Sequence, residues 1–133
     1  MMSAVADVAG LAQAVGGGTQ AGEGVVFELR VYHTNEGKLG DLMTRFRDHT
    51  ITIFNRHGME SVAYWTPTDD PLKDQTLFYI LKHPSREAAK ANWAAFMADP
   101  EWKSVSAASE ANGKIVIKVD STFLKLTDFS PKL

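Results

Sequence analysis

The sequence of 133 residues predicts an α+β protein with the ferredoxin-like element order β-α-β-β-α-(α)-β. Two observations carry this prediction. Four segments show the alternating or continuous apolar pattern of strands, and two longer segments repeat apolar residues at helical spacing. In this order the segments form a four-stranded antiparallel sheet whose helices cover one face only.

The first strand is expected at residues 25–33, where polar and apolar side chains alternate. Its two faces therefore differ. One face carries Phe27, Leu29 and Val31, and the other carries Glu28, Arg30 and Tyr32. A polar turn then leads into the first helix, whose apolar stripe runs from Leu39 to Phe54 and which ends at His57 and Gly58.

The second and third strands are expected at residues 59–66 and 75–83. A loop with two prolines halts the first of them, and the second is apolar almost throughout, as is typical of a central strand covered on both faces. The second helix begins at Pro84 and Ser85. Its inner stripe is Ala89, Trp93, Phe96 and Met97.

A shorter helix is expected from Pro100 to about Ala111, with Asp99 as its N-cap. Residues 114–118 are read as a short extra strand, and residues 121–128 as the last long strand. The folded domain therefore spans residues 25–133.

Residues 1–24 differ from the rest because small residues dominate and three consecutive glycines follow Val15. We expect a flexible tail or a linker. Residues 1–14 also resemble a truncated secretory signal, although a basic start is missing. The expected location is cytoplasmic, with export as the alternative if these residues are such a remnant.

Composition excludes several classes of function. Fourteen Lys and Arg residues against sixteen Asp and Glu residues leave no basic field for nucleic acid. No apolar run is long enough to span a membrane. The absence of cysteine excludes disulfides, thiolate metal sites and cysteine nucleophiles.

The uncovered sheet face predicts a homodimer. If helices cover the apolar face of the first strand, Glu28, Arg30 and Tyr32 need another partner, which a second copy of the sheet supplies. Two such sheets packed face to face form a dimeric α+β barrel.

The motifs along the chain resemble the NIPSNAP family in their order and spacing. They are Phe27–Tyr32 with Glu36–Lys38, Phe46–Thr50, His57–Met59, Ala63–Thr66, Phe96–Trp102 and Leu126–Pro131. The resemblance covers residues 25–132 and implies the dimeric α+β barrel fold. It implies no catalytic residues, because the family has no agreed set, and so the catalytic residues of this chain stay unknown.

Two groups of residues are candidates for ligand binding. Arg30 and Tyr32 can hold a carboxylate or phosphate inside the barrel, with a structural ion pair between Arg30 and Glu28 as the alternative. A pocket between helices and sheet can use His57 and Tyr64 as polar groups, with Trp93 and Phe96 as walls. The alternatives are a helix-terminal histidine and ordinary core aromatics.

No metal site is expected, because the four histidines lie on different elements without ligand spacing. No cofactor is predicted, and haem bound through His57 is the alternative. The preferred function is binding of a small organic molecule, with no assignable reaction. The other hypotheses are an enzyme of the cofactor-independent monooxygenase or isomerase type and a non-enzymatic scaffold protein.

Overall fold

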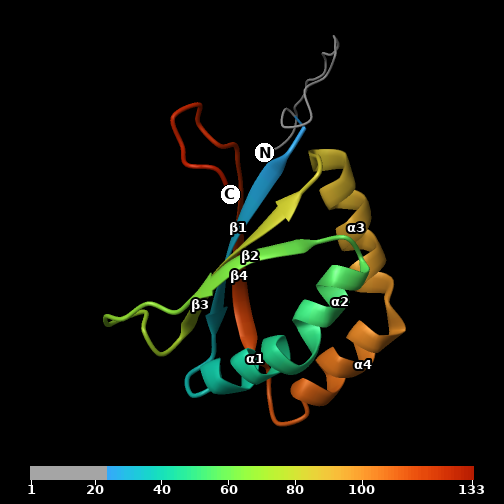
Figure 1. Cartoon of the computed structure of the whole chain (residues 1–133). Helices are drawn as coiled ribbons and strands as arrows, with labels where there is room; N and C mark the ends of the chain where they lie inside the picture. The colour runs from blue at the N-terminus through green and yellow to red at the C-terminus, as the bar shows by residue number, and fades with distance from the viewer. Residues whose placement is uncertain (1–23) are drawn as a thin grey trace.

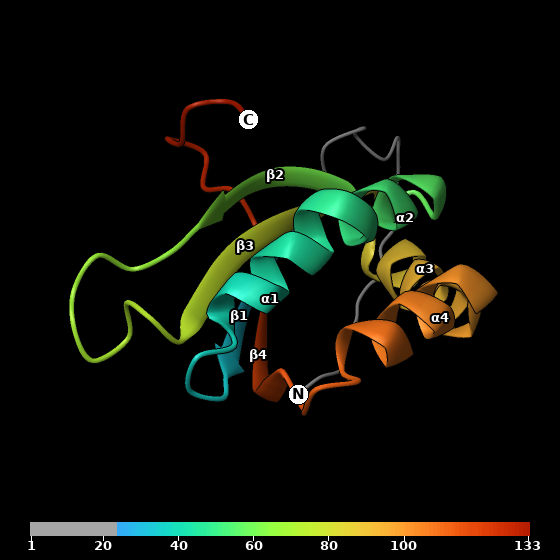
Figure 2. The same cartoon turned by 90° about the horizontal axis from the view of Figure 1, so that it is seen from below.

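The computed structural model describes residues 24–133, so the predictions for residues 1–23 lie outside the described part of the chain. The elements are β1 (Val26–Thr34), α1 (Leu39–Arg45), η2 (Phe46–Thr50), α2 (Ile51–Arg56), β2 (Glu60–Trp65), β3 (Thr76–His83), α3 (Arg86–Ala98), α4 (Pro100–Ser109) and β4 (Val116–Leu124). The strands form one antiparallel sheet in the order β2-β3-β1-β4 (Figure 1). All helices lie on one face of it (Figure 2). These observations confirm the predicted ferredoxin-like fold.

The first helical segment is continuous but changes pitch in the middle, where η2 is a π-helix. Leu42, Phe46, Thr50 and Phe54 are all buried and follow one another at intervals of four residues. In a regular α-helix each such step overshoots a full turn by about 40°. The wider π turn reduces this drift and keeps the four side chains on the core side.

Three predicted helix boundaries are confirmed, whereas α4 ends at Ser109, slightly before the predicted Ala111. Gly58 follows α2 with a φ of 78°, a conformation that suits glycine after a helix. Ser85 caps α3 by accepting a hydrogen bond from the Ala88 amide, and Asp99 caps α4 by accepting one from the Glu101 amide. Met97 was expected inside but is exposed, because the neighbouring Phe96 occupies the buried face of α3.

The C-terminal strand was predicted wrongly as two pieces. β4 is one strand that pairs along β1 from Thr34 to Phe27, with a register shift beside His33. Polar residues in the middle of β4 also find partners on β1. Asp120, for example, lies 3.0 Å from the imidazole of His33.

The assignment of the two faces of β1 was also wrong. Glu28, Arg30 and Tyr32 point toward the helices, whereas Leu29 and Val31 lie on the uncovered face. The polar side chains tolerate burial because they hydrogen-bond to one another and to α3. The uncovered face is therefore more apolar than the sequence suggested.

No helix among residues 24–133 is both long enough and apolar enough to cross a membrane.

Candidate functional site

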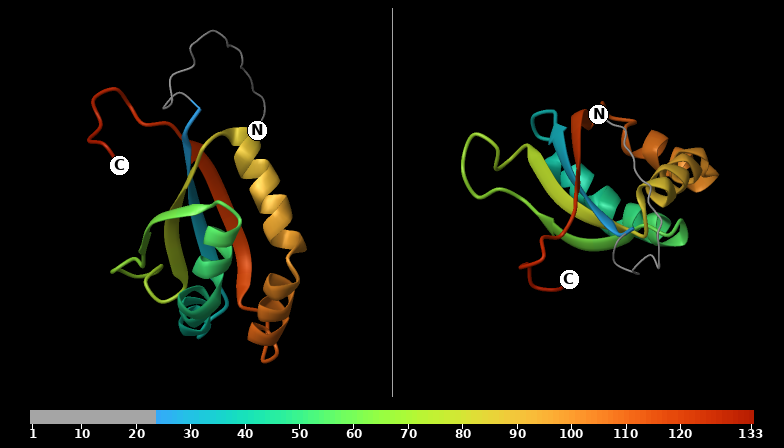
Figure 3. Two further views of the ribbon diagram at one scale, coloured as in Figure 1. Left: turned by 45° about the vertical axis from the view of Figure 1, so that its right-hand side comes forward. Right: turned by 90° about the horizontal axis from the view of Figure 1, so that it is seen from above.

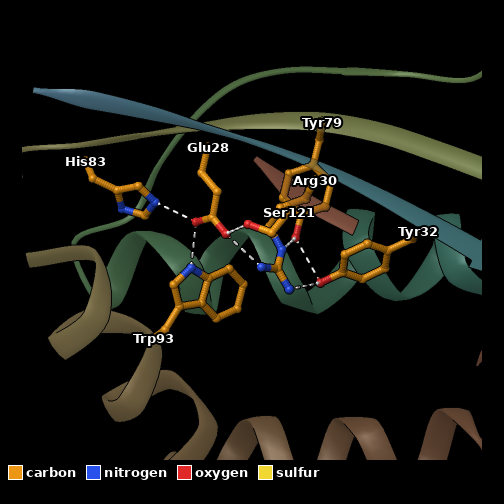
Figure 4. A network of polar contacts seen from close by, with 7 residues as sticks. All are labelled: Glu28, Arg30, Tyr32, Tyr79, His83, Trp93 and Ser121. Carbon is orange, nitrogen blue, oxygen red and sulfur yellow. Dashed lines mark hydrogen bonds and ion pairs between the residues drawn. The ribbon is translucent and has the colours of Figure 1, made fainter. Parts of the chain in front are cut away.

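The Glu28 carboxylate is the centre of a buried polar network between the sheet and α3 (Figure 4). Its side chain is only 2% exposed. Four side chains bond to it from four elements: His83 Nε2 at 2.9 Å and Trp93 Nε1 at 2.8 Å on Oε1, and Arg30 Nη1 at 2.8 Å and Ser121 Oγ at 2.7 Å on Oε2. Each oxygen thus has two donors, which fills the acceptor positions of the carboxylate.

Arg30 is the only one of these groups with a net positive charge at every working pH. Its Nε donates to the Tyr79 hydroxyl at 3.1 Å, and its Nη2 donates to the Tyr32 hydroxyl at 3.3 Å. Its guanidinium carbon lies 4.1 Å from the centroid of the Trp93 ring. Because three of the five N–H groups have acceptors here, two remain for another partner. The side chain is 16% exposed, so solvent reaches it.

The surroundings fix the charges of this pair. Burial raises the pKa of Glu28, but the hydrogen bonds from His83, Ser121 and Trp93 and the charge of Arg30 outweigh it and lower the pKa to about 2. Burial alone would lower the pKa of Arg30. The nearby hydroxyls of Tyr32 and Tyr79 and the carboxylate of Glu28 have the larger, opposite effect, so the pKa of Arg30 is raised. Both groups are therefore ionised across the physiological range, and together they are neutral.

Tyrosine hydroxyls form the second part of the network. Tyr79 donates a 2.9 Å hydrogen bond to Tyr32, and its burial raises its pKa well above the usual value. Tyr64 stacks on Tyr79 with ring centroids 5.1 Å apart, and burial raises its pKa to about 12. Tyr64 and Tyr79 thus stay neutral and act as hydrogen-bonding groups, not as bases.

A groove runs beside the network between α3 and β4, and we call it the β4 groove. Its volume is about 560 Å³, and its lining is Glu28, Arg86, Glu87, Ala89, Lys90, Trp93 and Phe123. The helices do not cover the inner side of β4 (Figure 3). Ser121 and Val119, which pair with Arg30 and Tyr32, are accordingly exposed, Val119 by 41%. Glu28 therefore lines the groove directly, and its partner Arg30, which is 16% exposed, lies next to it.

The chemistry of the site favours hydrogen bonding over proton transfer. Glu28 is a weak base with both oxygens occupied, and its neighbouring phenols are neutral. Of the described polar atoms in this network, His83 Nδ1 is buried without a hydrogen-bond partner. Residues 24–133 contain no group of three His, Asp or Glu side chains suited to hold a metal ion.

The structure brings most of the predicted ligand residues together. Arg30, Tyr32 and Trp93 are in direct contact in the network. Phe96 is buried behind them, with its ring centroid 5.4 Å from that of Trp93. Tyr64 joins through its stacking on Tyr79.

His57 lies apart from this group, at the junction of α2 with α3 and α4. Its Nε2 is 2.6 Å from the Asp99 carboxylate, which Arg56 also contacts at 2.6 Å. Hydrogen bonds from Arg56 and then His57 lower the pKa of Asp99. A haem iron at this nitrogen would have to displace Asp99.

Sequence reasoning missed three members of the network, namely His83, Tyr79 and Ser121. The alternation of β3 puts Leu77, Tyr79, Leu81 and His83 on one face, but the nearly continuous apolar run concealed it. Ser121 becomes visible as a partner only when the register places it opposite Arg30. The pairing of strands was the missing information.

Together, fold and site define a ferredoxin-like α+β domain with a buried ion pair beneath its helices. The family model for NIPSNAP matches residues 27–131. The chain therefore belongs to the NIPSNAP family.

Solved structures share this fold. A NIPSNAP family protein with unknown function from Agrobacterium tumefaciens has 23% identity and a TM-score of 0.69, over 81% of this chain and 93% of that one. A NIPSNAP-like domain protein from Burkholderia xenovorans has 18% identity and a TM-score of 0.69, over 82% and 90%. SnoaB, a cofactor-independent oxygenase from Streptomyces nogalater, has 14% identity and a TM-score of 0.55, over 82% and 99%. No curated protein matches this chain.

Proposed function

We propose that this protein binds a small organic molecule in the β4 groove, oriented by Arg30, which lies next to the lining residue Glu28. The observation that carries the proposal is that the Arg30 guanidinium is held in place while part of its hydrogen-bonding capacity is unused. Glu28, Tyr32 and Tyr79 hold the guanidinium in place, yet it is partly exposed and has two N–H groups without acceptors among residues 24–133. A fixed donor of this kind binds an oxygen atom without first losing its own conformational freedom.

We infer a neutral ligand. Glu28 already balances Arg30, and the other charged lining residues, Arg86, Glu87 and Lys90, include both signs. The rings of Trp93 and Phe123 line the groove and give it apolar surface for a flat ligand, and the Arg86 guanidinium lies 3.8 Å from the centroid of the Phe123 ring. The ligand class is therefore a small aromatic molecule with a carbonyl-type oxygen.

Isothermal titration with neutral aromatic ketones, matched with aromatic carboxylates of equal size, tests this proposal. We expect saturable binding of a ketone in the wild type and at least about tenfold weaker binding in Arg30→Lys, which keeps the ion pair but loses the planar donor geometry. Arg47→Lys is the matched control, since Arg47 is exposed and lies outside the β4 groove. Unchanged affinity in Arg30→Lys would contradict the role of Arg30, and tighter binding of the carboxylates would contradict the ligand class.

We further infer that the protein is a homodimer joined through the uncovered sheet face. Leu29, Val31, Phe78 and Ile80 share this face and are only partly covered within one chain. Trp65, at its edge, is 49% exposed. An apolar sheet face of this kind is typical of a self-complementary interface.

A further inference from the structure

A second groove lies between the first helical segment and α4, and we call it the η2–α4 groove. Its volume is about 500 Å³. Its lining is mostly polar and consists of Asp41, Thr44, Arg45, His49, Ser104, Val105, Ala108, Ser109 and Asn112. It shares no lining residue with the β4 groove.

Arg45 is a buried cation in this groove without a counter-charge. It is 6% exposed, and no ion pair within residues 24–133 includes it. Its one hydrogen bond, from Nη1 to the Ser109 hydroxyl, is 3.3 Å long. Its Nε is buried and has no acceptor in the described chain.

Neighbouring groups compensate this charge only in part. The guanidinium carbon lies 5.1 Å from the centroid of the Trp102 ring, a weak attraction compared with an ion pair. Burial lowers the pKa of Arg45, and Tyr32 and Glu110 act against this from a distance. Glu110 does not approach closely, because its carboxylate accepts a hydrogen bond from the Ile115 amide at 3.2 Å.

Buried charges in proteins are normally paired, so an arginine left in this state indicates a missing acceptor. We propose that the η2–α4 groove binds a small oxyanion, either a phosphate or a carboxylate group, with Arg45 as its main donor. The hydroxyls of Thr44 and Ser104 and the Asn112 amide line the same groove and supply further donors.

One carboxylate lies in the groove, and it does not compete for Arg45. Asp41 is exposed and lies 3.7 Å from the ammonium group of Lys38 on the preceding turn. That pair is close to neutral, so it neither repels the anion strongly nor replaces it. This inference is independent of the function proposed for the β4 groove, since it concerns different residues and a charged ligand.

Titration with inorganic phosphate and, separately, with acetate tests the inference, with sodium chloride at equal ionic strength as the reference. We expect a saturable rise in melting temperature with phosphate or acetate and no comparable rise with chloride. In Arg45→Met, which removes the unpaired charge while keeping the volume similar, affinity should fall at least about tenfold. Arg47→Met is the control and should keep the rise, because Arg47 is exposed and does not line this groove.

The wild type also supplies a direct readout by nuclear magnetic resonance, so the test does not depend on the folding of a variant. The Arg45 Nε–H resonance should shift and saturate at the same anion concentration as the melting temperature. A rise that persists in Arg45→Met, or the absence of a saturable shift of this resonance with both anions, overturns the proposal.

Discussion

The Arg30 guanidinium lies over the indole ring of Trp93 between β1 and α3, with its carbon 4.1 Å from the ring centroid. The same indole donates a 2.8 Å hydrogen bond to Glu28, which is the ion-pair partner of Arg30. Trp93 therefore contacts both members of the pair, and through them α3 is fixed to β1.

Replacing Trp93 by Phe removes the hydrogen bond to Glu28 and keeps an aromatic ring over Arg30. We expect the free energy of unfolding to fall by about 1.5–3 kcal/mol, since the lost bond goes to a charged acceptor. Urea denaturation measures this change. Trp65→Phe is the control, and its effect should stay within about 0.5 kcal/mol because the Trp65 side chain is half exposed. Equal losses in the two variants would show that the hydrogen bond contributes nothing.

Replacing Glu28 by Gln leaves the largely buried Arg30 without its counter-charge. We expect a loss of about 3–5 kcal/mol, as for other buried pairs from which one partner is removed. The double variant Glu28→Gln, Arg30→Met should recover part of this loss, because it removes the unpaired cation as well. A double-mutant cycle measured by urea denaturation gives the coupling energy. Additive losses would contradict a direct interaction between the two residues.

Glu28 also predicts how stability depends on pH. Its pKa is about 2 in the folded protein, below its usual 4.5, so the folded state favours the ionised form. The stabilisation is fully present above pH 4.5 and is lost as the pH falls toward 2. Melting temperatures measured across this range should fall more steeply in the wild type than in Glu28→Gln. Parallel curves would exclude Glu28 as the titrating group.

The contacts of His57 predict a structural role. Since its Nε2 bonds to Asp99, the cap of α4, His57→Ala should lower the melting temperature without ligand. It should leave the affinity for a ligand of the β4 groove within about threefold, because His57 does not line that groove. A larger loss of affinity would restore His57 to the binding site.

The uncovered sheet face predicts the effect of a charge placed on it. Ile80→Lys should convert the proposed dimer into a monomer, because a charged side chain would be buried at the interface without a partner. Sedimentation velocity at micromolar concentration measures the change. Lys82→Ile, on the same face near its end, is the matched control and should remain dimeric. A wild type that sediments as a monomer of 14.6 kDa would refute the dimer itself.

The fold was predictable from sequence because its signals are local. Ser85, Asp99 and Gly58 mark helix ends through their own backbone chemistry, and alternation marks β1. The orientation of β1 was not predictable in the same way. Alternation separates two faces but does not say which one meets the helices, and the usual preference for burying apolar side chains gave the wrong answer.

The site was predictable only in part for the same reason. Arg30, Tyr32 and Trp93 were identified as candidates from their residue types. Their organising group, Glu28, was regarded only as an ion-pair partner, and His83 was not among the candidates. Both judgements needed the register of β1 with β3, which sets Glu28 beside Leu81 and His83 beside Val26.

The bonds of Glu28 have a consequence for the order in which the chain folds. These hydrogen bonds join Glu28 to His83, Trp93 and Ser121, which lie 55, 65 and 93 positions further along the chain. The carboxylate therefore has all its hydrogen bonds only after β4, the last strand, has paired with the sheet. Closing such long loops is slow compared with forming local helices. In a variant whose other tryptophans, Trp65 and Trp102, are replaced by Phe, the fluorescence of Trp93 should change late in refolding, after helical circular dichroism has recovered. Because Trp93 bonds to Glu28, its fluorescence would report when the hydrogen bonds around this carboxylate, and with them the sheet, are complete.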